Sequence, residues 1–245
     1  MPTTDADGRG ELMLALLADA RLPTGAHTQS GTLEPALRGG LRPDQVPAYI
    51  AARLRTVVRV EAAVAVVARH VVAGPDAGRV AGLVDAWRHW EARTPSKALR
   101  DSSVRLGRGQ QRLLAGLWPA HRGVRALADA VALRRSEHPS TPPVHPPRPL
   151  VVGVTAACAG LSGAQTARLV AYDDVQTVAA ATLKLAPLDP VETIRWVVDS
   201  HDAVEALVAE TRDLIDADRI PAIGAPLIEQ WAETHARTDE RLFSA

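Results

Sequence analysis

The residues best suited to chemistry are two adjacent carboxylates, Asp173 and Asp174, in the run DDVQT. Carboxylate oxygens are the ligands that Mg²⁺ prefers, and the run is similar to half of the aspartate-rich magnesium motif of helical prenyl-transfer enzymes. It lacks the third carboxylate and a second acidic cluster, so the pair alone would not hold several ions around a diphosphate. Together with Arg168, it still defines an alternative function, namely an all-helical small-ligand-binding protein or a metal-dependent enzyme.

The other candidate ligands are isolated in the sequence. His138 and His145 lie in a proline-rich stretch, where two histidines would bind nickel, zinc or copper only weakly and are better explained as solvent-exposed. Cys158 lies in an apolar run without a His or Cys beside it, so we expect a small buried core residue. Phosphate-loop, dinucleotide, HExxH and paired-cysteine motifs are missing from the sequence. We therefore expect no catalytic residue, metal site or cofactor, and a protein that is not an enzyme.

Three segments break the helical amphipathic pattern without supplying chemistry. The first is the polar run His27–Ser30, which follows a Pro–Gly break and leads to Glu34. The second is the segment 163–186, which is apolar on nearly all faces, and the third is the chain end, where Leu242 and Phe243 follow polar residues. A helix that is apolar all round is central in a core or contacts a second protein, and an apolar pair at a chain end is unusual. The pattern favours binding to protein partners.

The overall charge argues against several classes of partner. Lys and Arg total 28, as do Asp and Glu, so no net field attracts nucleic acid or an anionic membrane. This balance and the lack of a basic recognition helix also argue against a transcriptional regulator. The longest apolar run, around residues 150–161, is too short to span a bilayer. The polar N-terminus is not a signal peptide, and a single cysteine fits a reducing compartment, so we expect a cytoplasmic protein.

Hydrophobic spacing and capping signals predict helices almost throughout. The expected ranges are 11–20, 27–38, 43–73, 76–93, 95–117, 120–135, 163–186, 189–215 and 226–243. Ser162 with Gln165 forms a capping box for the seventh of these. The expected fold class is therefore all-α, a single-domain multi-helix bundle of about nine to ten helices over residues 1–245. Prolines predict a flexible loop at about 137–149, and the tail at about 235–245 is expected to dock on a partner.

Four motifs resemble those of the UreF family of urease accessory proteins, in the same order along residues 12–244. The stretch LADARLPTGAHTQSGTLEPAL is similar to the family's opening motif, close to L-x-x-x-x-x-P-x-G-x-F-x-x-S-x-G-L-E. The matching residues are Pro23, Gly25, Ser30, Leu33 and Glu34, whereas His27 replaces the usual aromatic residue and Thr32 the usual glycine. Three further stretches resemble the family's later motifs. They are LRDSSVRLGRGQQRLL, TLKLAPL at 182–188, and His235 with RLFSA at the chain end.

The resemblance implies an all-helical protein that acts in nickel delivery to urease and is not an enzyme. It implies a scaffold that bridges a UreD/UreH-type accessory protein and a UreG-type GTPase, reaches the urease apoprotein through that complex, and forms a homodimer. The residues expected to contact partners are Ser30, Glu34, His235, Arg241, Leu242 and Phe243, and those expected at the dimer interface are Arg168, Tyr172, Val175 and Leu183. We expect Glu34 to be a surface carboxylate, and the tail to be loosely packed until a partner orders it.

Overall fold

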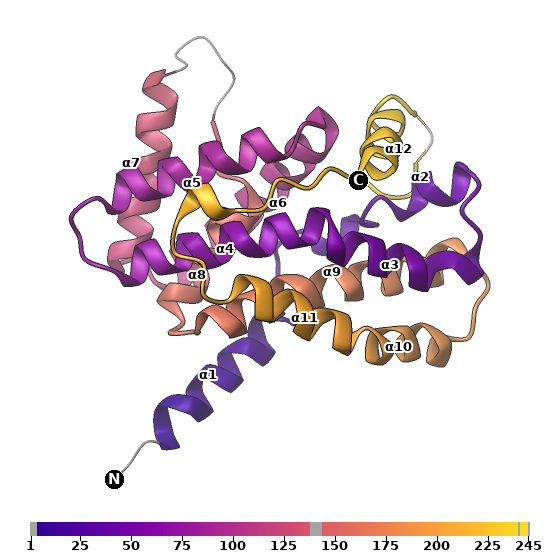
Figure 1. The fold of residues 1–245 in the computed structure, drawn as a ribbon, viewed down its shortest axis with the longest axis horizontal. Coiled ribbons are helices and arrows are strands. Elements are labelled where there is room, and N and C mark those ends of the chain that lie inside the picture. Colours follow the sequence, from indigo (N-terminus) through magenta and orange to yellow (C-terminus); the bar gives the residue numbers. More distant parts are fainter. Residues whose placement is uncertain (1–3, 138–143, 240, 245) are drawn as a thin grey trace.

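The structure, a computed structural model, describes residues 4–137, 144–239 and 241–244. These residues form twelve α-helices and three 3-10 turns, and no strand (Figure 1). The first six helices are α1 (Thr4–Leu17), α2 (Leu33–Arg38), α3 (Val46–Arg55), α4 (Val57–Ala73), α5 (Arg79–Arg93) and α6 (Lys97–Leu117). The others are α7 (Arg122–Glu137), α8 (Arg148–Cys158), α9 (Gly163–Leu185), α10 (Pro190–Asp199), α11 (His201–Thr211) and α12 (Pro226–Ala236). The turns are η1 (Ala26–Thr28), η2 (Pro43–Gln45) and η3 (Ala217–Arg219). The predicted all-α class is confirmed.

Two of the predicted long helices are divided in the structure. The range 43–73 becomes η2, α3 and α4, with a break at Thr56, and the range 189–215 becomes α10 and α11, which meet at Ser200. At each break a hydroxyl donates to the carbonyl three or four residues earlier, at 2.8 Å for Thr56 and 2.7 Å for Ser200. The same kind of bond occurs within intact helices, at Thr182 of α9 and Thr155 of α8, so the hydroxyl alone does not divide a helix. At Thr56 the backbone itself leaves the helical region, with a φ of −123° and a ψ of −100°.

The helices that carry the first and last motifs are shorter than predicted. The range 27–38 is reduced to α2, because Gly31 and Thr32 have positive φ angles and turn the chain before Leu33. The last helix ends at Ala236 instead of near 243, because the following residues turn back toward α2. Both differences lie where residues 242–244 contact the segment that leads into α2.

Helices α4 and α9 occupy the centre of the bundle (Figure 1). Helix α9 packs against α4, α10 and α11 and also contacts α2 and α3. Its predicted capping box is confirmed, since Ser162 Oγ accepts the N–H of Gln165 at 3.2 Å and the Gln165 side chain accepts the N–H of Ser162 at 2.9 Å. Small residues allow close packing here, because a Cβ on Gly153 of α8 would lie 2.3 Å from the carbonyl oxygen of Ala65 on α4. The apolar character of α9 on nearly all faces is explained by its place in the core of one chain.

Thr32 combines a β-branched side chain with a left-handed backbone. Its φ is 66° and its ψ is 10°, and the residue is buried directly before α2. A left-handed conformation costs a non-glycine residue about 1 to 2 kcal/mol, because Cβ crowds the following carbonyl oxygen. This is the position at which the family motif usually has glycine, so the backbone explains that preference.

Replacing Thr32 by glycine is expected to raise the free energy of unfolding by about 0.5 to 1 kcal/mol. Relief of the left-handed strain outweighs the additional unfolded-state entropy of glycine, which is about 0.5 to 1 kcal/mol. Thermal unfolding followed by circular dichroism measures the change. The matched control is Thr32→Ala, which keeps a Cβ on the left-handed backbone. A melting temperature of Thr32→Gly at or below that of Thr32→Ala would contradict this explanation.

The predicted proline-rich loop at about 137–149 lies partly outside the described residues, at 138–143. Its two flanks are helical, because α7 ends at Glu137 and α8 already begins at Arg148. Pro149 lies in the first turn of α8, where a missing N–H costs no helical hydrogen bond. Within the part of the chain that the structure describes, no helix is long and apolar enough to cross a membrane.

Candidate partner-binding site

The chain end lies against the opening segment, so the first and last motifs of the sequence form one site (Figure 1). The backbone N–H of Ser244 donates to the carbonyl of Thr28 at 2.9 Å, and its hydroxyl donates to the same carbonyl at 2.9 Å. The side chain of Gln29 donates to the Ser244 hydroxyl at 3.3 Å. We call this contact, formed by residues 28–34, His235 and residues 241–244, the tail clamp.

Glu34, in the first turn of α2, is the centre of the tail clamp. Its side chain is 1% exposed and accepts the backbone N–H groups of Leu242 and Phe243, each at 2.8 Å. The guanidinium of Arg38, one turn later on α2, lies 2.8 Å from the same carboxylate. A buried carboxylate is tolerated only when it is paired or hydrogen bonded. Two peptide groups of the tail and one arginine meet that requirement here.

Helix α12 contributes the other side of the clamp. The Nε2 atom of buried His235 lies 3.1 Å from the carbonyl oxygen of Phe243 and 3.9 Å from the Glu34 carboxylate. Because a carbonyl oxygen only accepts hydrogen bonds, this ring nitrogen must carry a proton. The Phe243 ring is buried in the same apolar cluster as Leu33, and the Lys184 ammonium lies 5.2 Å from its centroid.

The tail clamp corrects the interpretation of the predicted contact residues. Glu34 and Ser30 are buried, so the expected surface carboxylate is wrong. Phe243 lies in the core of its own chain, so the expectation of a loosely packed tail with a free aromatic anchor is also wrong. Arg241 is exposed, and Leu242 is 62% exposed. Among the six predicted contact residues, these two are the ones that a partner can reach.

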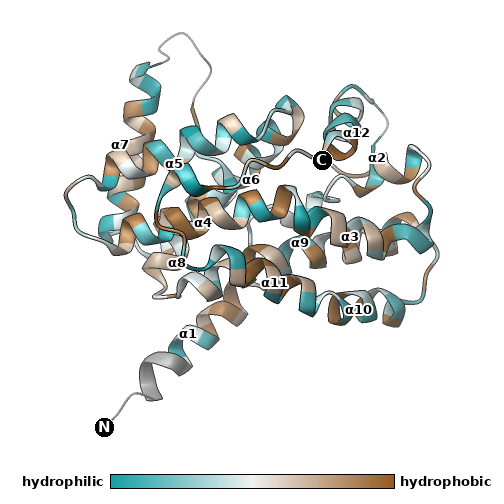
Figure 2. Ribbon diagram, viewed as in Figure 1, coloured by the Kyte–Doolittle hydropathy of each residue, from teal (hydrophilic) through white to brown (hydrophobic). Residues whose placement is uncertain are grey.

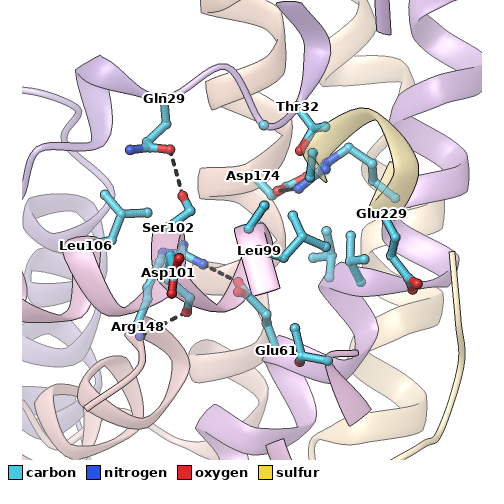
Figure 3. A pocket seen from close by; sticks show the side chains of 18 of the residues that line it. Gln29, Thr32, Glu61, Leu99, Asp101, Ser102, Leu106, Arg148, Asp174 and Glu229 are labelled. Atoms are coloured by element: carbon cyan, nitrogen blue, oxygen red, sulfur yellow. Dashed lines mark hydrogen bonds and ion pairs between the residues drawn. The ribbon is translucent and has the colours of Figure 1, made fainter. Parts of the chain in front are cut away.

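Beside the tail clamp, buried charges surround a cavity of about 290 Å³ (Figure 3). Arg53 of α3 makes a two-bond ion pair with Asp174 of α9, with Nε–Oδ2 at 2.9 Å and Nη2–Oδ1 at 2.5 Å. Arg148, at the start of α8, bridges Glu61 of α4 and Asp173 of α9 at 2.6 and 2.5 Å. The side chains of both arginines are about nine-tenths buried. The network therefore joins α3, α4, α8 and α9 around the cavity.

Burial and pairing oppose each other in this network. Burial raises the pKa of the Glu61 carboxyl, and the nearby Arg148 guanidinium offsets part of that rise. Burial is the largest single influence on Arg53 and lowers its pKa, but the charges and hydrogen bonds of Asp174 and Tyr49 together outweigh burial and leave that pKa above its usual value. The paired arginines therefore remain charged, and the carboxylates serve to hold them.

Gln29 of the tail clamp also lines the cavity (Figure 3). Its carbonyl oxygen accepts the hydroxyl of Ser102 on α6 at 3.0 Å, while its amide nitrogen bonds to Ser244 of the tail. The neighbouring Ser103 accepts the backbone N–H of Arg148 at 3.1 Å. The serines of the α6 motif thus connect the opening segment with the charged network.

These ion pairs account for the aspartate pair on which the alternative function rested. Asp173 binds Arg148 and Asp174 binds Arg53, so the two carboxylates do not converge on one ion. Within residues 4–137, 144–239 and 241–244, no group of three or more His, Cys, Asp or Glu is placed to hold a metal ion. Arg168 pairs instead with Glu205 at 2.7 Å. The observed contacts of all three residues stabilise the fold.

The residues predicted for a dimer interface do not all reach the surface. Val175 is fully buried in the core, so its assignment to an interface is wrong. Tyr172 is half-buried, and its hydroxyl accepts the Gln176 amide at 2.7 Å. Arg168 is partly exposed beside its ion pair, and Leu183 is exposed near the end of α9. Three of the four predicted residues therefore reach the surface.

Cys158 has a neighbour that the sequence does not reveal. Its sulfur lies 3.0 Å from Nδ1 of His121, which also accepts the N–H of Gly123 at 3.0 Å. The cysteine is half-buried and not fully buried as expected. Burial raises the pKa of the thiol to about 12, and burial together with Arg122 lowers the pKa of His121. The contact joins a neutral thiol to a neutral imidazole, unlike the ion pair of an activated nucleophile.

Cys158 is expected to react with iodoacetamide at pH 8 at least tenfold more slowly in the folded protein than in the urea-unfolded chain. The thiolate is the reactive form, and a pKa of about 12 leaves very little of it at that pH. Mass spectrometry of timed samples gives both rates, and the folded-state rate should still increase between pH 8 and pH 10. Equal rates in the two states would show that the thiol is not protected.

Comparisons with known proteins agree with the four motifs. The UreF family model matches residues 42–201. The chain is 33% identical to the urease accessory protein UreF of Mycobacterium sp. strain JLS over 238 residues, which cover 95% of this chain and 97% of the relative. The UreF proteins of Mycobacterium marinum and Mycolicibacterium vanbaalenii are 31% and 32% identical, over 95% of this chain and 98% and 97% of their own. On this evidence, the chain belongs to the UreF family of urease accessory proteins.

Proposed function

We propose that this protein is a scaffold in urease maturation, which bridges a UreD/UreH-type accessory protein and a UreG-type GTPase during nickel insertion into the urease apoprotein. Membership of the urease accessory family supports this role. The observation that carries it is the tail clamp, which joins two family-like motifs into one site made of peptide contacts. The ionisable groups of this site, Glu34 and His235, bind the backbone of the tail, which suits a surface for a protein partner.

In this proposal the UreD/UreH-type partner contacts Arg241 and Leu242. The tail clamp fixes their backbone, so less conformational freedom is lost when the partner binds. Buried Ser30, Glu34, His235 and Phe243 act indirectly, by holding the exposed pair in place. The GTPase binds elsewhere on the bundle, and the urease apoprotein is reached through the complex. The protein works in the cytoplasm without a cofactor, nucleic acid or membrane, and it assembles partners without catalysing a reaction.

Co-purification tests the bridging role. A tagged UreD/UreH-type protein is expected to retain the UreG-type GTPase only when this chain is co-expressed. Leu242→Asp should reduce recovery of the UreD/UreH-type protein, leave the GTPase bound to the chain, and leave the melting temperature unchanged. If the two partners co-purify equally well without the chain, the bridging role is refuted.

We also propose that the protein forms a homodimer through the exposed part of α9. The surface there includes Arg168, Tyr172 and Leu183, and a formal net charge of zero gives little repulsion between copies. Tyr172→Asp is expected to shift the protein to monomers in sedimentation velocity runs. The control Leu133→Asp alters an exposed residue on α7 and should leave the dimer intact. A wild-type protein that sediments as a monomer at high micromolar concentration would refute the dimer.

A further inference from the structure

Helix α10 presents an apolar stripe to solvent. Val191, Ile194 and Val198 are 62%, 53% and 55% exposed, and their spacing of three and four residues places them on one face. Figure 2 shows hydrophobic segments along α10 in brown. The opposite face of the same helix buries Thr193, Trp196 and Val197 against the bundle. The helix is therefore apolar on two sides, although packing within the chain requires only one of them.

A groove of about 480 Å³ runs beside this stripe, between α3 and α10. Its apolar floor and side include Ile50, Leu54, Ala51, Trp196 and Val191. Because Val191 belongs to both the stripe and the groove, the two form one continuous surface, which we call the α10 groove. None of its lining residues belongs to the tail clamp.

The rim of the α10 groove is acidic. It carries the carboxylates of Asp189, Glu192 and Asp199 against one cation, Arg195. Asp189 accepts the N–H of Val191 at 2.9 Å as the helix cap. In the described part of the chain, neither Glu192 nor Asp199 lies within ion-pair distance of a basic group. The rim thus has a local charge of about −2, although the whole chain is formally neutral.

We propose that the α10 groove binds a cationic amphipathic segment of a protein partner, with the partner's apolar side chains on the stripe and its Lys or Arg side chains at the acidic rim. Charge complementarity selects this occupant, because an anionic membrane or a nucleic acid would be repelled by three carboxylates. The choice of partner proteins in the test below rests on the proposed function in urease maturation, whereas the binding experiments with synthetic peptides are independent of that function.

Variants of exposed residues separate the two parts of this surface. Ile194→Asp places a charge in the stripe, and the double variant Glu192→Lys, Asp199→Lys reverses the rim. Leu133→Asp, on exposed α7, is the matched control for the first change, and Asp129→Lys on the same helix controls for the second. Circular dichroism melts of all variants should coincide with the wild type, because the altered side chains are exposed or at the rim.

The probes are a synthetic helical peptide of leucine and lysine, its leucine and glutamate counterpart, phosphatidylserine vesicles, and the separately purified UreD/UreH-type, UreG-type and urease apoproteins. By fluorescence anisotropy the lysine peptide should bind the wild type at least tenfold more tightly than the glutamate peptide. Ile194→Asp and the rim variant should each bind the lysine peptide at least tenfold more weakly than the wild type, and the two control variants should bind it as tightly as the wild type. One of the three proteins should show the same pattern of losses.

Equal binding of the lysine peptide to the wild type, Ile194→Asp and the rim variant would overturn the α10 groove as the site. Binding to phosphatidylserine vesicles that Ile194→Asp abolishes would overturn a protein occupant, as would a change of oligomeric state in that variant. If the wild type binds none of the three proteins, the proposed urease function fails, while the peptide series still decides the groove. If a protein binds all variants equally, the groove fails and the proposed function stands.

Discussion

Replacing Glu34 by alanine is expected to lower the free energy of unfolding by about 3 to 5 kcal/mol. The carboxylate accepts the N–H groups of Leu242 and Phe243 in a buried site, with Arg38 as its charge partner. Hydrogen bonds to a charged group are worth about 1.5 to 3 kcal/mol each, and a buried N–H that is left unpaired costs about 1 to 3 kcal/mol. The substitution removes the acceptor of both bonds at once and leaves the tail without its main polar contact.

Chemical and thermal unfolding followed by circular dichroism measure this loss. For a chain of this length, each kcal/mol shifts the melting temperature by about 2 to 4 °C, so the expected decrease is roughly 6 to 20 °C. Glu34→Gln keeps one acceptor oxygen and should lose about half as much. Asp129→Ala, on the exposed face of α7, is the control and should change little. An unchanged melting temperature for Glu34→Ala would return this residue to the role of a surface carboxylate.

Replacing Phe243 by alanine is expected to lower the free energy of unfolding by about 3 to 4 kcal/mol. Its ring is buried in the main apolar cluster and lies beneath the Lys184 ammonium. Removing a buried phenylalanine side chain costs about 3 to 5 kcal/mol, from lost apolar burial and the cavity left behind. The lower part of the range applies here, because residues 241–244 are not part of a helix and can adjust.

The neighbouring Leu242 is the matched control for Phe243. It is exposed, so Leu242→Asp should leave the melting temperature unchanged while Phe243→Ala lowers it by roughly 6 to 16 °C. The same two proteins separate folding from recognition when the UreD/UreH-type partner is titrated into them. Unchanged stability of Phe243→Ala would show that the aromatic ring is not part of the core and would restore the partner-ordered tail.

The helical class and the start of α9 were predictable because they depend on local signals. The capping box at Ser162 and Gln165 gave the start of α9, and the apolar spacing gave its length. The breaks at Thr56 and Ser200 were missed, because the apolar pattern continues across both of them. The short α2 was missed because a left-handed threonine is rare and no local pattern indicates it.

The sequence indicated several residues of the tail clamp but not their arrangement. Ser30, Glu34, His235 and Phe243 were identified in two separate motifs, each assigned to a partner. The structure places them against each other, at sequence separations of more than 200 residues. Hydrophobic periodicity carries no information about such contacts. A buried carboxylate such as Glu34 needs hydrogen-bond donors, and here the donors are the backbone N–H groups of Leu242 and Phe243. The unusual apolar character of these two residues was the one sequence signal that this segment is buried.

The network around the cavity was missed for a related reason. Asp173 and Asp174 were read together as possible metal ligands because they are adjacent in sequence. In the helix they point toward different arginines, and those arginines come from α3 and α8. Likewise, the apolar faces of α9 were compatible with either a core or an interface. The structure shows that Val175 lies in the core, because α9 is central in the bundle.

The most direct test of the proposed scaffold is the nickel content of urease made in cells with and without this chain. Urease structural genes and the UreD/UreH-type and UreG-type proteins are expressed with the wild-type chain, with Leu242→Asp, or with neither. Purified urease is then analysed for nickel and for urea hydrolysis. The account predicts nickel-loaded, active urease with the wild type, and several-fold less of both with Leu242→Asp or without the chain. Urease with the same nickel content and activity in all three samples would contradict it.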